Sequence, residues 1–174
     1  MEVTMNLPLT PEELKQLKCG DKINISGVIY TARDAAHKKM TEAISLNKEL
    51  PFPLKNSTIY YAGPCPAAPN EIIGSVGPTT SYRQDPYTPT LLDNGLKIMI
   101  GKGNRSKSVI DSMIKNKAVY LVAIGGAGLV VANAIKKVDV IGYEELGTEA
   151  IRRLEVENLE LIVAIDIEGN NIYV

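Results

Sequence analysis

The fold is indicated most clearly by residues 97–124, KIMIGKGNRSKSVIDSMIKNKAVYLVAI, which read as strand, helix and strand in succession. Two apolar runs, Lys97–Ile100 and Val119–Ile124, predict strands on either side of a helix near Ser106–Asn116. The alternation continues through a helix across Leu129–Ile135 and a strand over Lys137–Ile141. Strands separated by helices at this spacing predict an α/β fold with a mainly parallel sheet.

The N-terminal part adds shorter elements. Weak alternation over Val3–Leu7 predicts an edge strand. Thr10-Pro11-Glu12-Glu13 has the residues of a capping box and predicts a short helix that ends near Gly20. The alternating run Lys22–Thr31 predicts a strand with a bulge at Gly27.

A second helix start follows this strand. Thr31-Ala32-Arg33-Asp34 fits the Ser/Thr-x-x-acid pattern, and the next fifteen residues suit an amphipathic helix with Ala36, Met40, Ala43 and Ile44 facing the core. The remaining elements expected are strands at Ser57–Ala62 and Glu71–Val76, a helical turn at Pro89–Asp93, and a terminal hairpin of Leu161–Ile167 and Asn171–Val174. We expect one domain over residues 1–174.

Composition excludes several function classes. The chain is 45% hydrophobic and 22% charged, as expected of a soluble globular protein, and its net charge of −1 argues against nucleic-acid binding. No apolar run has the length of a membrane span, and the N-terminus Met1–Thr4 has no basic region followed by an apolar one, so we expect a cytoplasmic protein. Two distant cysteines and one histidine cannot build a structural zinc site or a Cys-ligated cluster, so no metal site is expected in this chain.

The most distinctive loop is Gly74–Asp85, GSVGPTTSYRQD. It combines the consecutive hydroxyl groups of Thr79, Thr80 and Ser81 with one guanidinium between glycine and proline residues. Glycine lets backbone N–H groups approach a ligand, and the Arg83 fork matches a carboxylate or a phosphate in two places. The loop is therefore predicted to bind an anion.

Three cations, Arg33, Arg83 and Lys102, each follow a predicted strand. If the strands are parallel, the three side chains meet at one edge of the sheet around Thr79 and Thr80, where they suit a small polyanion such as a dicarboxylate. No strong acid or base accompanies them, and a threonine hydroxyl is too weak a base without help. The site looks like half of a complete one.

Other interpretations of these residues stay open. Arg33 is equally well explained as a surface cation paired with Asp34 or Asp21, and His37 as an ordinary helix residue. The loop after Lys97–Ile100 lacks the spacing of a Walker phosphate loop, so nucleotide binding is a weak alternative. Gly125-Gly126-Ala127-Gly128 misses the dinucleotide fingerprint and suggests tight helix–strand packing.

Taken together, these motifs resemble the β subunit of two-subunit class I (iron–sulfur) fumarate hydratases, the C-terminal domain of the single-chain enzymes, and the related L-tartrate dehydratases. The resemblance covers nearly the whole chain in order. It runs through Gly20-Asp21, Thr31–His37, Gly74–Ser81, Arg83, Asp85, Gly101–Asn104, Gly125-Gly126, Glu145–Ala150, Leu154–Val156, Asp166 and Gly169-Asn170.

The resemblance implies a swivelling β/β/α three-layer domain that docks on a larger α subunit, as a heterodimer or higher α/β oligomer. The α subunit of this family holds a [4Fe–4S] cluster that binds the substrate as a Lewis acid. Carried over, Arg33, Thr80, Arg83 and Lys102 would bind a C4 dicarboxylate. Thr79 would move the C3 proton, with Arg83 and Lys102 assisting catalysis.

Roles for His37, Asp34 and Asp85 are less defined, although all three match family positions. The chain departs from the family in having Arg83-Gln84-Asp85 where Arg-Met-Asp is usual. Arg33-Asp34-Ala35-Ala36-His37 resembles the fumarases more than the tartrate enzymes, which favours malate and fumarate as substrates. The alternatives are another 2-hydroxy-dicarboxylate dehydratase, such as L-tartrate dehydratase, or a non-catalytic anion-binding module.

Overall fold

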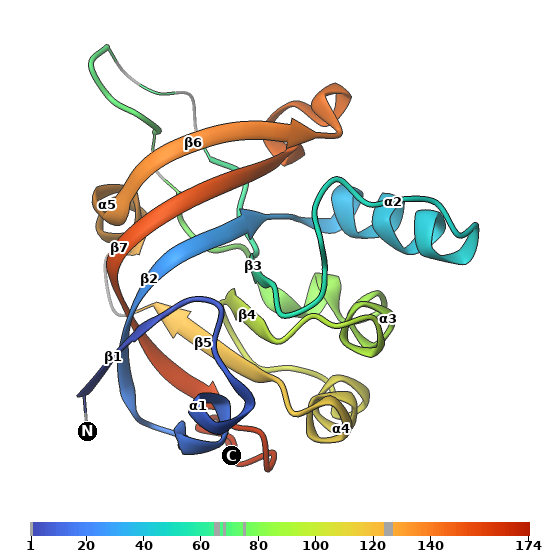
Figure 1. The fold of residues 1–174 in the computed structure, drawn as a ribbon, viewed down its shortest axis with the longest axis vertical. Helices are drawn as coiled ribbons and strands as arrows, with labels where there is room; N and C mark the ends of the chain where they lie inside the picture. Colours follow the sequence, from blue (N-terminus) through green and yellow to red (C-terminus); the bar gives the residue numbers. More distant parts are fainter. Residues whose placement is uncertain (1, 65–66, 68, 75, 124–126) are drawn as a thin grey trace.

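The computed structural model describes residues 2–64, 67, 69–74, 76–123 and 127–174 (Figure 1). Within these residues the strands are β1 (Glu2–Asn6), β2 (Lys22–Thr31), β3 (Thr58–Tyr60), β4 (Ile98–Gly101), β5 (Val119–Ala123), β6 (Ile135–Gly142) and β7 (Ile151–Ile165). The helices are α1 (Pro11–Gln16), α2 (Asp34–Ser45), α3 (Thr88–Asp93), α4 (Lys107–Asn116) and α5 (Ala127–Ala134), with 3-10 segments η1 (Ser81–Gln84) and η2 (Glu144–Glu149).

The sheet is closed by its last strand. Strands β1 to β5 lie side by side in parallel, and β7 then pairs antiparallel with β5, β6 and β2. The pairing of β7 with β2 joins β2, β3, β4, β5 and β7 into a ring, visible as the strongly curved sheet in Figure 1. The predicted swivelling β/β/α three-layer domain with a mainly parallel central sheet is therefore wrong. The molecule is a closed, barrel-like sheet of mixed direction with helices on its outside.

The closed sheet buries side chains on both of its faces. Along β4, Ile98 and Ile100 face one apolar cluster while Met99 faces the other, as the alternation of strand side chains requires. The inner cluster is shared by all five ring strands and includes Ile25, Ile29, Tyr60, Ile98, Ile100, Val119, Leu121, Leu154, Leu161 and Val163.

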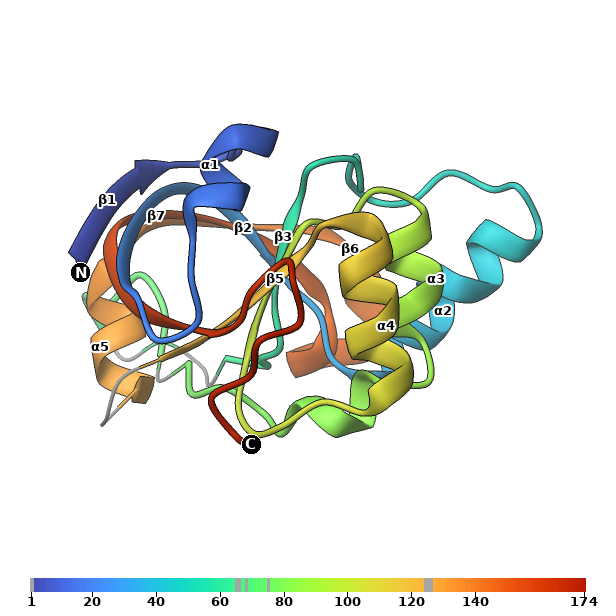
Figure 2. The same ribbon diagram turned by 90° about the horizontal axis from the view of Figure 1, so that it is seen from below.

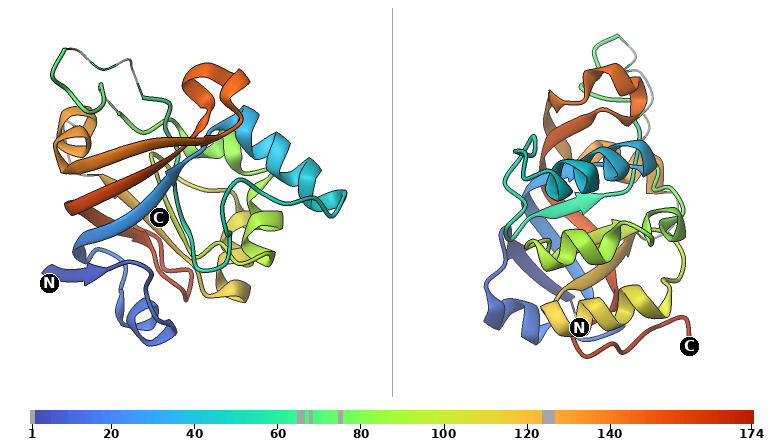
Figure 3. Two further views of the ribbon diagram at one scale, coloured as in Figure 1. Left: turned by 45° about the horizontal axis from the view of Figure 1, so that its top comes forward. Right: turned by 90° about the vertical axis from the view of Figure 1, so that its right-hand side faces the viewer.

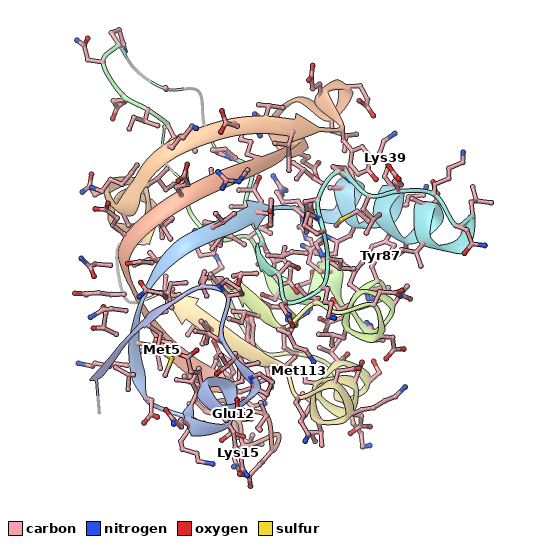
Figure 4. All side chains as sticks on the ribbon, in the orientation of Figure 1. Met5, Glu12, Lys15, Lys39, Tyr87 and Met113 are labelled. Carbon is pink, nitrogen blue, oxygen red and sulfur yellow. The ribbon has the colours of Figure 1, made fainter. Side chains whose placement is uncertain are left out.

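The outer cluster lies between the sheet and three helices. Figures 2 and 3 show α2, α3 and α4 in a row along one side of the sheet, with α1 and α5 placed elsewhere. This cluster includes Ala36, Met40, Ile59, Tyr61, Leu91, Leu92, Met99, Val109, Met113 and Tyr120. Met5 and Met113, both labelled in Figure 4, belong to the inner and the outer cluster respectively.

Several local predictions are confirmed. Thr10 and Glu13 form both hydrogen bonds of the capping box at the start of α1. Strand β1 lies at an edge of the sheet, and α3, α4 and β5 fall close to their predicted ranges. The register of β2 against β7 shifts between Ile25 and Gly27, which is the predicted bulge.

Three local predictions are wrong. Thr31 does not cap α2, because it ends β2, where its hydroxyl accepts the N–H of Arg152; Arg33 is the N-cap residue and makes no side-chain capping bond. The described residues of Glu71–Val76 form no strand. The expected terminal hairpin reduces to one bridge between Ile165 and Asn171, since residues 151–165 form the long strand β7.

Gly27 offers a test of the bulge. Its φ is +134°, and an added Cβ would lie 2.8 Å from the Cβ of Leu7. Gly27→Ala is expected to lower the free energy of unfolding by about 2–3 kcal/mol, because a strained backbone and a clash act together. Gly20→Ala is the control: its φ is +93° but nothing lies within 4 Å, so a loss of only about 1 kcal/mol is expected. Urea denaturation of both variants makes the comparison, and equal losses would contradict the close packing at Gly27.

Candidate functional site

The candidate site residues leave the sheet at one edge. Strands β2, β3 and β4 are parallel neighbours, with Thr31 opposite Tyr60 and Tyr60 opposite Ile100. Their carboxyl ends therefore lie at the same edge, which is where open parallel sheets place ligands. Arg33 follows β2 by two residues and Lys102 directly follows β4.

The loop that carries the threonines is attached at this same edge. The N–H of Thr79 donates to the carbonyl of Tyr61 at 2.7 Å, and the N–H of Ser81 donates to the carbonyl of Lys102 at 2.9 Å. Between them, Thr80 forms an isolated parallel bridge with Lys102. The backbone thus places Thr79 and Thr80 between the segments that follow β3 and β4, with Lys102 as a direct neighbour.

Arg83 lies in η1, immediately beyond this attachment, and its side chain is exposed. The next residue, Gln84, donates its side-chain N–H to the carboxylate of Asp34 at 3.4 Å. This bond joins η1 to the first residue of α2, next to Arg33. The segments that carry Arg33 and Arg83 are therefore in contact through their neighbours.

Arg33 is half-buried and is directed toward Gly63. An added Cβ at Gly63 would lie 3.2 Å from Arg33 Cδ and 3.3 Å from Arg33 Nη1. Within the described residues, Arg33 Nε, His37 Nε2 and Gln84 Oε1 are buried polar atoms without a hydrogen-bond partner. Since buried polar atoms are normally paired, the junction of α2 and η1 has hydrogen-bonding capacity that these parts of the chain do not use.

His37 is buried and neutral. Its Nδ1 lies 2.8 Å from the carbonyl oxygen of Arg33, which can only accept, so Nδ1 carries the proton and Nε2 is left as an acceptor. The ring packs edge-on against Tyr61, with ring centroids 5.4 Å apart. Burial lowers the pKa of His37 to about 4.

This depressed pKa predicts a pH-dependent stability. Unfolded His37 binds a proton near pH 6.5 and the folded protein resists it, so stability is complete above pH 6.5 and falls toward pH 4. Acidification from pH 7 to pH 5 should cost about 2 kcal/mol through this one group. Chemical denaturation of wild type and His37→Gln at both pH values measures it. A pH effect of the same size in the variant would show that His37 is not responsible.

Asp85 is already engaged within the chain. Its Oδ1 accepts from Arg105 Nε at 2.8 Å, and its Oδ2 accepts from the N–H of Ser106 at 2.8 Å. Both carboxylate oxygens of Asp85 are thus engaged within the chain, and its contribution to the site stays a prediction. Arg105 is buried, and the sequence does not predict this. No motif marks it, and an arginine before a helix-capping serine normally faces solvent.

A cavity formed by the described residues lies elsewhere. It has a volume of about 670 Å³ and is lined by β6, η2 and the segment around Ile72 and Ile73. None of the predicted cations or threonines lines it. The Gly125-Gly126 pair considered for nucleotide binding lies outside the described residues.

A cluster site does not fit the described residues of this chain. They contain no group of three His, Cys, Asp or Glu side chains that could hold a metal ion. The thiol of Cys19 lies 3.6 Å from the carbonyl oxygen of Ala164, whereas Cys65 lies outside the described residues. Also within the described residues, no helix is both long and apolar enough to cross a bilayer.

The segments that carry Arg33, Thr79, Thr80 and Lys102 meet at one edge of a closed sheet, which is the arrangement of a candidate anion-binding module. Residues 1–174 match the family described as "Fumarase C-terminus", and the chain belongs to that family. This confirms the resemblance to class I fumarate hydratases and L-tartrate dehydratases that the motifs indicated.

The individual relatives are of two kinds. The chain is 41% identical to "Putative L(+)-tartrate dehydratase subunit beta" of Methanocaldococcus jannaschii, covering 99% of this chain and 91% of that protein. It is 38% identical to "Fumarate hydratase class I, anaerobic" of Escherichia coli and 39% identical to "Fumarate hydratase 1, mitochondrial" of Leishmania major. The chain spans only 32% of the length of each of these two fumarate hydratases.

Proposed function

We propose that this chain, as one domain over residues 1–174, is the β subunit of a two-subunit [4Fe–4S] hydro-lyase. Its proposed activity is fumarate hydratase, the reversible dehydration of (S)-malate to fumarate. One observation carries the proposal. Backbone hydrogen bonds hold Thr79–Ser81 to Tyr61 and Lys102, at the same edge of the sheet where the chain continues from β2 to Arg33. The proposal assigns the cluster to an α subunit, since the described residues here do not form a site for one.

The part of this chain in the reaction follows from its charges. Arg33, Arg83 and Lys102 bind the two carboxylates of a C4 substrate. The same cations stabilise the charge that develops on the carboxylate next to C3 when the C3 proton leaves. Thr79, as an alkoxide that the neighbouring cations stabilise, takes that proton in dehydration to become the neutral hydroxyl, and returns it in hydration. It is the candidate because its backbone is fixed beside Lys102 and its side chain is half-buried.

Reconstitution tests the proposal directly. The chain is co-expressed with a class I fumarase-type α subunit from the same organism, purified without oxygen and assayed with (S)-malate and fumarate. We expect the complex to interconvert them and the isolated chain to be inactive. An isolated chain that binds succinate strongly, joins no α subunit and yields no activity would support a non-catalytic anion-binding module instead.

A second substrate has its own support. The Methanocaldococcus jannaschii relative, of which the chain covers 91%, is named for L(+)-tartrate, whereas the fumarate hydratases are matched over 32% of their length. The same complex is therefore assayed with L-tartrate. A kcat/KM for L-tartrate above that for (S)-malate would make L-tartrate dehydratase the function.

Arg83→Ala is expected to lower kcat/KM for (S)-malate by about 100-fold, because a paired charge on a substrate carboxylate is lost. Lys48→Met is the control, since Lys48 is an exposed cation beyond the far end of α2. Initial rates on the reconstituted complexes measure both. Wild-type kcat/KM in Arg83→Ala would remove this residue from the site.

Thr79→Val is expected to lower kcat by about 100-fold or more, as loss of a proton-transfer group does, while Thr79→Ser keeps most of the activity. Exchange of the C3 proton in D₂O, followed by NMR, isolates the proton-transfer step. The role of Thr79 is refuted if Thr79→Val exchanges this proton at the wild-type rate.

A further inference from the structure

Arg105 is a fully enclosed charge that lies beside the candidate site without belonging to it. Its side chain has no exposed surface. The guanidinium is flanked by the rings of Tyr61 and Tyr120, whose centroids lie 5.1 and 4.8 Å from its central carbon. Burying a charge so fully is unfavourable unless it is paired and hydrogen-bonded, so the surroundings of Arg105 must satisfy it.

Each nitrogen of the guanidinium has a partner. Nε donates to Asp85 at 2.8 Å, Nη2 donates to both Tyr61 OH and Thr88 Oγ1 at 3.1 Å, and Nη1 lies 3.4 Å from the sulfur of Met99. These partners come from four places: the end of β3, the residue after η1, the start of α3, and β4. Only the planar fork of an arginine can reach all of them at once.

Two of these partners fix the end of η1. Asp85 donates its N–H to the carbonyl of Tyr82, and the Thr88 hydroxyl donates to the carbonyl of Gln84 at 2.7 Å. By holding Asp85 and Thr88, Arg105 determines where the chain leaves η1. Arg83 lies between these attachments.

The start of η1 is held through Tyr120. The Tyr120 hydroxyl donates its single hydrogen to the carbonyl of Gly103 at 2.7 Å. Ser81 must therefore donate to Tyr120, at 2.7 Å, while it accepts the N–H of Lys102 at 3.0 Å. The ring of Tyr120 also packs on Arg105, so the side chain of Tyr120 connects the start of η1 with the residue that holds its end.

We propose that Arg105 is a positioning residue that sets the placement of Arg83 and Lys102 for dicarboxylate binding. It acts through Asp85, Thr88 and Tyr120 and does not touch the substrate, since its donors are engaged within the chain and its side chain is enclosed. This inference rests on the proposed function.

The test uses the reconstituted α/β complex with Arg105→Lys, which keeps the charge and loses the fork. A misplaced Arg83 should raise KM for (S)-malate and the inhibition constant of succinate, a non-reacting C4 dicarboxylate, each by about tenfold. Merely less folded protein would lower kcat alone. Arg153→Lys is the matched control, because Arg153 is half-buried on β7 and pairs with Glu155.

Thr88→Val is the second variant, in case Arg105→Lys does not fold. It is close to isosteric and removes only the hydroxyl that links Arg105 to Gln84, so KM and the succinate constant should rise about threefold. Wild-type values of both constants in the variant that folds, whatever its kcat, overturn the inference. If the wild-type complex is inactive on 2-hydroxy dicarboxylates, the proposed function is wrong instead. The succinate affinities of the wild-type and variant complexes, compared with each other, then test the role of Arg105 alone.

Discussion

The pairing of β7 with both β2 and β5, which are separated by β3 and β4 in the sheet, is the constraint on which the rest of the structure depends. β7 runs antiparallel to β2 along one side and to β5 and β6 along the other, so the sheet has to curve until it closes. Closure creates an enclosed inner cluster and leaves the outer face of the ring to α2, α3 and α4. It also holds the parallel strands β2, β3 and β4 in fixed register, which sets the edge from which the candidate site is built.

Local and distant interactions divide what could be predicted. Three confirmed predictions depend on residues close in sequence. They are the capping box of α1, the strand–helix–strand unit around α4 and the bulge at Gly27. The ring was missed because β7 derives its length from partners more than a hundred residues away. Thr31 had the pattern of a helix cap, yet its hydroxyl is used by Arg152, which only the tertiary fold brings near.

The site shows the same division. Arg33, Arg83 and Lys102 stand out in the sequence because each follows a predicted strand. The strand predicted before Arg83 is wrong, whereas the parallel order of β2, β3 and β4 brings the segments of Arg33 and Lys102 to one edge. Arg105 carries no such signal. Its importance arises from Asp85, Thr88 and two tyrosines that converge on it from separate elements, and this convergence cannot be read from spacing.

The hydrogen bonds of the threonine loop have a consequence for how selectivity can change. The amides of Thr79, Ser81 and Lys102 all donate inward, to a carbonyl or a hydroxyl of the chain itself. They are therefore not free to cradle an oxyanion in the manner of a glycine-rich phosphate loop. Under the proposed function, discrimination between one diacid and another comes from the reach and charge of side chains, because these amides are already engaged. A change of substrate can then arise from replacing single side chains, with the path of the loop unchanged.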